Sequence, residues 1–185
     1  MRKSYEAVIS DDRYIRNIEY GEPRSGHPEG QVKYHIVELD EKLEILRAKG
    51  ISDGQYWKLK FIIHVHDTFK AEATPNSPIE SLNSHSSLAR KFAAEFTDDD
   101  DILNMIQFHD VNYSLWKQFE ATGSYNKERF DKLLATIKDW EVFLMFIVLD
   151  GTTSGKDPLP TSWFVKMVNQ KIKTAVDETW IALEN

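Results

Sequence analysis

Apolar residues recur along most of the chain at the three- and four-residue spacing of amphipathic helices. In the first such stretch, Val32, Ile36 and Leu39 begin a series that continues to Leu46, and Gly50 ends it. The same spacing predicts helices over residues 31–49, 55–66, 79–96, 98–109, 112–121, 126–149 and 160–182. Six or seven helices with little strand character predict an all-α domain.

The first 30 residues lack this spacing and are rich in turn formers. The pair Asp11-Asp12, and the glycines and prolines from Gly21 to Gly30, predict an extended or hairpin-like lead-in followed by a loop. With 185 residues, the chain is expected to form one domain that buries roughly 70% of its unfolded surface. Its expected parts are the lead-in and loop at 1–30, a helical core over 31–150 and a packing helix over 160–182.

Composition and charge exclude several classes of protein. The net charge of −7 disfavours binding to a nucleic-acid backbone, because phosphates repel an acidic surface. The chain has no cysteine, which excludes disulfides and thiolate metal ligands and fits a cytoplasmic location. Its first residues carry no secretory signal, and its longest apolar run, 142–149, is much too short to span a membrane. A cytoplasmic protein without a membrane partner is therefore expected.

Histidines on the inward faces of four different predicted helices are the main candidates for chemistry. A buried imidazole without a partner costs a few kcal/mol, so each must be hydrogen-bonded, charged or bound to a metal. One such histidine would be an ordinary core residue, but four beside Asp67 and Asp150 at helix ends favour a metal centre. The four inward histidines are His35, His66, His85 and His109.

The central motif is the pair His66-Asp67, which closes an apolar run and is followed three residues later by Lys70. Imidazole suits zinc, iron and manganese, and a carboxylate can bridge two cations. Helical phase turns His66 inward and places His64 on the opposite side, with Lys60.

Two segments around this motif resemble a known family. The sequence HPEGQVKYH at 27–35, followed by HDTFK at 66–70, is similar to the HD superfamily of metal-dependent phosphohydrolases. The HPEG part is particularly similar to the HD domain of bacterial tRNA nucleotidyltransferases. The resemblance covers about residues 27–150, and the order of the predicted ligands matches the H-HD-H-H-D pattern of the binuclear branch, namely His35, His66, Asp67, His85, His109 and Asp150.

The chain also departs from the family. Phe69 stands where members often carry glycine, so we do not expect a positive-φ backbone there. The nucleotidyltransferase catalytic domain has no counterpart, so the resemblance implies the HD fold and its metal chemistry rather than tRNA end maintenance.

The resemblance implies how the ligands would be shared between one or two divalent metal ions. His35, His66 and Asp150 would hold one ion, His85 and His109 the other, and Asp67 would bridge them. Manganese, iron, cobalt, nickel and zinc all suit such a ligand set. A mononuclear site that uses only the first group and Asp67 remains an alternative.

The activity implied is hydrolysis of a small phosphorylated molecule, above all a nucleotide or a phosphodiester. A hydroxide held by the metals would attack phosphorus, so Asp67 is expected to be catalytic. Lys70 is expected to act with it by stabilising the developing negative charge; otherwise it is a surface lysine. Arg24 and His27, in the loop before the first ligand helix, are candidate substrate contacts or parts of a structural Gly/Pro loop.

Further polar residues leave alternatives open. Glu29 could orient a ligand or a water, or act only as a favourable acid at a helix N-terminus. Asp110 could replace His109 as a ligand, although helical phase favours the histidine. The loop at 151–158 could cradle a phosphate, but it lacks the spacing of a Walker motif and an ordinary loop is favoured.

Rival functions share parts of this pattern. A di-iron oxygenase of the HD type would use the same ligands, and a non-catalytic regulatory domain could bind a metal or a nucleotide. A nucleic-acid-binding module conflicts with the negative net charge. Exposed tryptophans on the last helix could form the face of a homodimer.

Overall fold

The computed structural model describes residues 1–182, whose regular elements are all helices, which confirms the all-α class. Apart from the isolated bridge between Arg24 and His27, the described residues form no β-structure. None of the described helices is both long and apolar enough to cross a membrane. The helices are α1 (Arg2–Val8), α2 (Asp12–Asn17), α3 (Val32–Ala48), α4 (Asp53–Val65), α5 (His85–Ala93), α6 (Asp100–Phe108), α7 (Val111–Thr122), α8 (Lys127–Thr136), α9 (Trp140–Gly151), α10 (Leu159–Asn169) and the 3₁₀ helix η1 (Glu178–Ala182).

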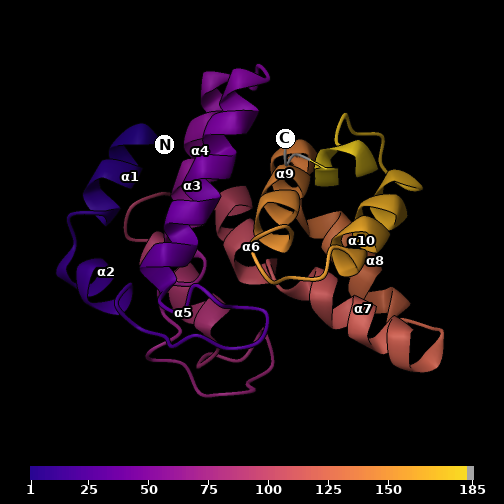
Figure 1. Ribbon diagram of the computed structural model, residues 1–185, viewed down its shortest axis with the longest axis horizontal. Helices are drawn as coiled ribbons and strands as arrows, with labels where there is room; N and C mark the ends of the chain where they lie inside the picture. Colours follow the sequence, from indigo (N-terminus) through magenta and orange to yellow (C-terminus); the bar gives the residue numbers. More distant parts are fainter. Residues whose placement is uncertain (183–185) are drawn as a thin grey trace.

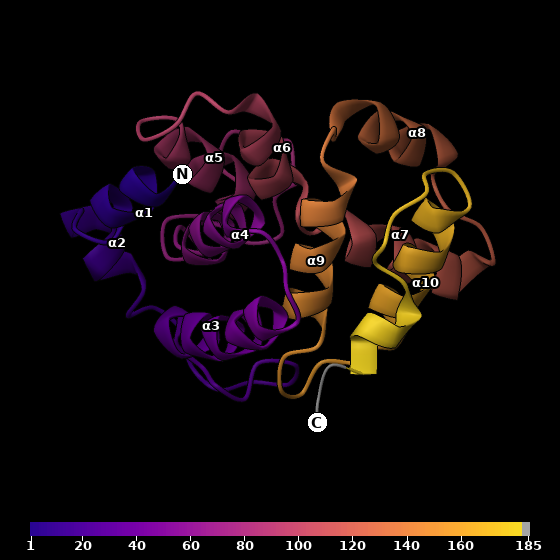
Figure 2. The ribbon, with the colours of Figure 1, turned by 90° about the horizontal axis from the view of Figure 1, so that it is seen from above.

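Helix α4 lies at the centre of the N-terminal part of the fold. It contacts α1, α3, α5, α6 and α9. In Figure 1 it overlaps α3, and Figure 2 shows it between α3 on one side and α5 and α6 on the other. A capping box begins it: Ser52 Oγ accepts from the Gln55 amide, and Gln55 Oε1 accepts from the Ser52 amide. Its second half, from Phe61 to Val65, is buried on all sides, as its nearly unbroken apolar sequence predicts.

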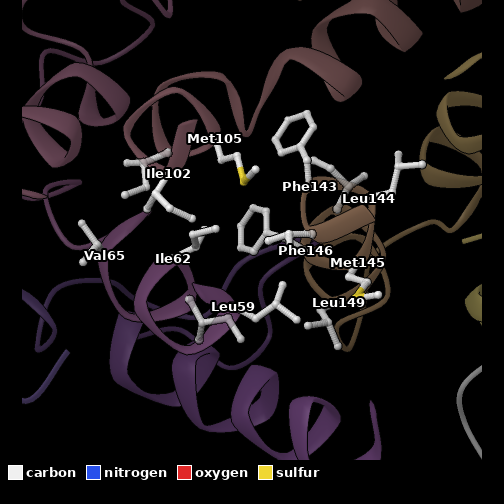
Figure 3. Close-up of a cluster of buried hydrophobic side chains, with 14 of the residues drawn as sticks. Leu59, Ile62, Val65, Ile102, Met105, Phe143, Leu144, Met145, Phe146 and Leu149 are labelled. Carbon is white, nitrogen blue, oxygen red and sulfur yellow. The ribbon is translucent and has the colours of Figure 1, made fainter. Parts of the chain in front are cut away.

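The core joins α4 to α6 and α9. Figure 3 shows side chains of the three helices meeting, among them Ile62, Met105 and Phe146. Phe146 is completely buried, and its ring lies edge-on to His66, with 5.1 Å between the ring centroids. The core packing therefore fixes the end of α4, where the candidate site begins.

The predicted extended lead-in at 1–30 is wrong for its first half, which forms α1 and α2. Asp11 does not begin a hairpin turn; its side chain accepts the backbone N–H of Arg13 and caps α2. Buried Tyr14 then anchors α2 on the core. Residues 21–31 remain an irregular loop, as predicted.

The predicted helix at 126–149 is two helices, because the chain turns between α8 and α9. Ile137 has extended backbone angles, and Asp139 caps α9 by accepting the amide of Val142. The carboxylate of Asp101 accepts the amides of Lys138 and Asp139, each at 2.8 Å. The apolar spacing continues through the break because Ile137 and Trp140 are both buried, so periodicity alone does not reveal it.

Two other helices are shorter than predicted. The helix expected at 79–96 begins only at His85, where Ser84 caps it, and the packing helix expected at 160–182 ends at Asn169. The two tryptophans expected to be exposed there, Trp163 and Trp180, are half-buried against the core. Trp163 stacks on Phe119 of α7, with ring centroids 5.1 Å apart.

Replacement of Asp101 by alanine tests the cause of the α8–α9 break. The change removes two hydrogen bonds from a carboxylate to backbone amides, so we expect a loss of roughly 1–2 kcal/mol in the free energy of unfolding. Urea denaturation measures it, with Asp98→Ala in the same acidic run as the control. Equal stability of the two variants would mean that Asp101 does not hold the break.

Candidate metal centre

The structure brings all six residues predicted as ligands together at one place. They come from the N-terminal half of α3, the C-terminal ends of α4, α6 and α9, and the start of α5. His35 Nε2 of α3 lies 3.0 Å from Asp150 Oδ1 at the end of α9. The close contacts of α3 and α9 with α4 place this pair beside the His66-Asp67 motif.

His66 is the C-cap residue of α4 and is fully buried. Its Nδ1 bonds to the carbonyl oxygen of Ile63 at 3.0 Å, which fixes the ring and directs Nε2 into the cluster. Nε2 lies 3.3 Å from Asp67 Oδ2 and 3.8 Å from Asp150 Oδ1, and has no hydrogen-bond partner. Burial lowers the pKa of His66, so the ring is neutral and Nε2 can offer its lone pair.

His85 and His109 form the other side of the cluster. The ring of His109 is fixed in the same way as that of His66: its Nδ1 bonds to the carbonyl oxygen of the residue three positions earlier, Ile106, at 2.7 Å. The Nε2 atoms of the two histidines are 3.1 Å apart, and they lie 3.6 and 3.5 Å from Asp67 Oδ1. His85 reaches this position from the first turn of α5, not from mid-helix as predicted.

Asp67 lies between two groups of imidazoles. Its Oδ2 faces His66, while its Oδ1 faces His85 and His109 and, although buried, has no hydrogen-bond partner. Two sets of ligand atoms that share Asp67 each lie within 4.8 Å of one another. Buried polar atoms without a partner, such as Asp67 Oδ1 and His66 Nε2, cost free energy unless something binds them. This cluster could therefore hold a metal ion.

The two carboxylates of the cluster are ionised despite their burial. Burial alone would raise the pKa of Asp67, but the ammonium of Lys70 holds it well below its ordinary value. Lys156 likewise holds the pKa of Asp150 well below its ordinary value against the effect of burial. Both anions are therefore available to ligate a cation at neutral pH.

Two of the histidines, His35 and His109, have raised pKa values and so carry a proton at neutral pH. Burial disfavours the charged form of His35, yet its hydrogen bond with Asp150 and the nearby carboxylate of Glu29 raise its pKa to about 9. Burial likewise disfavours charge on His109, but the nearby carboxylates, with Asp110 first, raise its pKa to about 9. A metal ion bound to these nitrogens would replace those protons.

Two lysines neutralise the carboxylates of the cluster. Lys70 pairs with Asp67 Oδ2, three residues before it, a contact that the sequence alone does not predict. Lys156 Nζ lies 2.8 Å from Asp150 Oδ1, although the sequence favours an ordinary loop at 151–158. Apolar periodicity carries no information about the path of a loop. The possibility that residues 151–158 cradle a phosphate is the one sequence feature that draws attention to this loop.

The loop before α3 adds His27 and Glu29 to the edge of the cluster. Glu29 Oε1 lies 2.9 Å from His27 Nδ1 and 3.2 Å from His35 Nδ1, so Glu29 can orient His35. Asp110 Oδ2 lies 3.2 Å from His85 Nε2, but the Asp110 side chain is 45% exposed whereas that of His109 is 2% exposed. This geometry favours His109 over Asp110 as the inner ligand.

His64 and Phe69 are placed as the sequence predicts. His64 faces away from the cluster, and its two ring nitrogens contact Tyr14 Oη at 2.6 Å and Asp40 Oδ2 at 3.1 Å. Phe69 packs on Phe92, and the described non-glycine residues with positive φ do not include it.

Two cavities open onto the cluster from different sides. The larger, of about 360 Å³, is bounded by the loops around Gly26 and Gly155 and by the starts of α7 and α10, and reaches Asp150. The smaller, of about 10 Å³, is lined by Arg24 and Lys70 and reaches Asp67. The candidate substrate contacts Arg24, His27 and Lys70 thus all line a cavity beside the cluster.

Comparisons of the chain with protein-family models, with curated proteins and with solved structures gave no match.

Proposed function

We propose that this chain is a metal-dependent phosphohydrolase of the HD type, acting on a small phosphorylated molecule. The observation that carries the proposal is the position of Asp67, whose two carboxylate oxygens face two separate groups of imidazoles. A carboxylate placed in this way is suited to bridge two cations about 3.5–4 Å apart, the arrangement that binuclear phosphatases use. The resemblance of residues 27–35 and 66–70 to the HD superfamily supports the same function.

The ligand set indicates what the cofactor would contribute. Divalent cations, when bound, would act as Lewis acids, lower the pKa of water to roughly 7 and leave positive charge in excess of the two carboxylates. His35, His66 and Asp150 would hold one ion, and His85 and His109 the other, with Asp67 shared. This surplus of positive charge suits an anionic substrate such as a phosphate ester.

The chain's own cations would bind and orient that substrate. Lys70 is largely buried beside Asp67, and its ammonium can donate hydrogen bonds to phosphoryl oxygens over the cluster. Lys156 lines the larger cavity beside Asp150, so it can donate to the oxygen of the departing group. Glu29 would hold the ring of His35 in position.

Phosphate release from a panel of nucleotides and simple phosphate esters tests the proposal, with manganese, cobalt or iron added to the purified protein. We expect turnover that depends on the metal and stops when a chelator is added. Bound iron with oxygen-dependent product formation, and no phosphate release, would contradict the hydrolase and indicate the oxygenase. Bound metal without any turnover would indicate a regulatory domain.

A further inference from the structure

The two cavities beside the cluster differ strongly in size, which bears on the kind of ester that would fit. The smaller, at about 10 Å³, has room for about one water molecule and none for an organic group. The larger, at about 360 Å³, lies within the size range of small-molecule sites. His27 lines both, so the two cavities lie next to each other, and only the larger has room for an organic group.

The smaller cavity has the chemistry of an anion site. Arg24 and Lys70 line it beside the carboxylates of Asp67, which pairs with Lys70, and Glu29, which contacts His27 and His35. Arg24 is exposed, and within the described chain its guanidinium makes no hydrogen bond or ion pair. The backbone of Arg24 is fixed by two hydrogen bonds with His27, at 3.0 and 2.9 Å, across a tight turn. Gly26 in this turn has a φ of 77°, which glycine adopts without strain. An unpaired guanidinium on a fixed turn is a ready partner for phosphoryl oxygens.

The larger cavity has a different lining. Besides Lys156 and Asp150, which pair with each other, it presents the carboxylates of Asp110 and Asp157. The exposed ring of Tyr113 and the amide of Asn112 also line it. Carboxylates, an amide and an aromatic ring suit a group with hydroxyls or amines, and they repel a second phosphate.

We propose that the substrate is a phosphate monoester of an uncharged, hydroxyl-bearing alcohol such as a sugar or a nucleoside. The alcohol occupies the larger cavity, and the terminal phosphoryl oxygens face Arg24 and Lys70. Hydrolysis breaks the bond between phosphorus and the alcohol oxygen; water supplies the new oxygen of phosphate, and the alcohol leaves with a proton. A diester fits less well, because the smaller cavity beside Arg24 and Lys70 has no room for its second organic group. The proposal rests on the phosphohydrolase function proposed above.

The test compares p-nitrophenyl phosphate, a monoester, with bis-p-nitrophenyl phosphate, a diester, on the metal-loaded protein. Both release the same coloured product, so the ratio of their kcat/KM values reports the preference for a monoester directly. We expect strong preference for the monoester. In Arg24→Ala, kcat/KM for the monoester should fall about 10- to 100-fold, the effect of losing charge-assisted hydrogen bonds, while that for the diester changes little.

Matched variants separate recognition from a structural effect of the turn. Arg24→Lys keeps the charge and should restore part of the monoester activity, and Arg47→Ala, about 18 Å along α3 from His35, should change neither substrate. Equal losses for both esters in Arg24→Ala, or a diester hydrolysed as well as the monoester, would overturn this inference. Absence of turnover for both esters by metal-loaded wild-type protein would instead overturn the phosphohydrolase function on which it rests.

The charge of the larger cavity gives a second readout. Adenosine monophosphate should be hydrolysed with a kcat/KM at least about tenfold above that of adenosine diphosphate, because the second phosphate would meet Asp110 and Asp157. Equal values would overturn the assignment of an uncharged organic group.

Discussion

Asp67→Ala is expected to remove bound metal and phosphate release together. Asp67 offers one oxygen to each group of imidazoles, so its loss affects both halves of the proposed site. Loss of a residue that only orients a metal ligand already costs about 10- to 100-fold in metal affinity, so we expect the loss of this shared ligand to cost more than about 100-fold. Metal analysis of the dialysed protein and a phosphate-release assay measure the two effects.

Two further variants make this result specific. Asp67→Asn keeps the shape of the side chain and should also lose metal, because the amide has no charge to offer. Asp40→Asn changes a carboxylate of α3 that pairs with His64 and Lys60, away from the cluster, and should keep its metal. Full metal content in Asp67→Ala would refute the assignment of Asp67 as the shared ligand.

Substitution of the two histidines at the end of α4 is expected to give opposite results. His66→Ala should lose metal and activity, because Nε2 of His66 points into the cluster. His64→Ala should keep both and lose about 1–3 kcal/mol of the free energy of unfolding, because Tyr14 and Asp40 lose a buried hydrogen-bond partner. Metal content and urea denaturation of both variants measure this difference. If His64→Ala loses the metal and His66→Ala keeps it, the site lies on the other face of α4.

The convergence of these histidines and aspartates could be predicted from the sequence, because most of them lie on regular helices. In α4, the regular apolar spacing fixes which of two nearby histidines turns inward, and the structure places His66 and His64 accordingly. The convergence of five helices follows from their common apolar core, to which each presents its inward face.

Features that depend on tertiary contacts or on loop paths could not be predicted in this way. The break between α8 and α9 depends on Asp101, which lies far from it in the sequence. The approach of Lys156 to Asp150 depends on the course of a loop, which apolar periodicity does not describe. At the N-terminus, Asp11 can begin either a turn or a helix, and packing of Tyr14 favours the helix.

The number of metal ions bound per chain tests the central claim most directly. The purified wild-type protein is supplied with manganese, iron, cobalt, nickel or zinc in turn, dialysed and analysed for metal. We predict about two ions per chain with at least one of these metals, one for each group of imidazoles that shares Asp67. A chain that retains none of the five metals would contradict the assignment of this cluster as a metal centre.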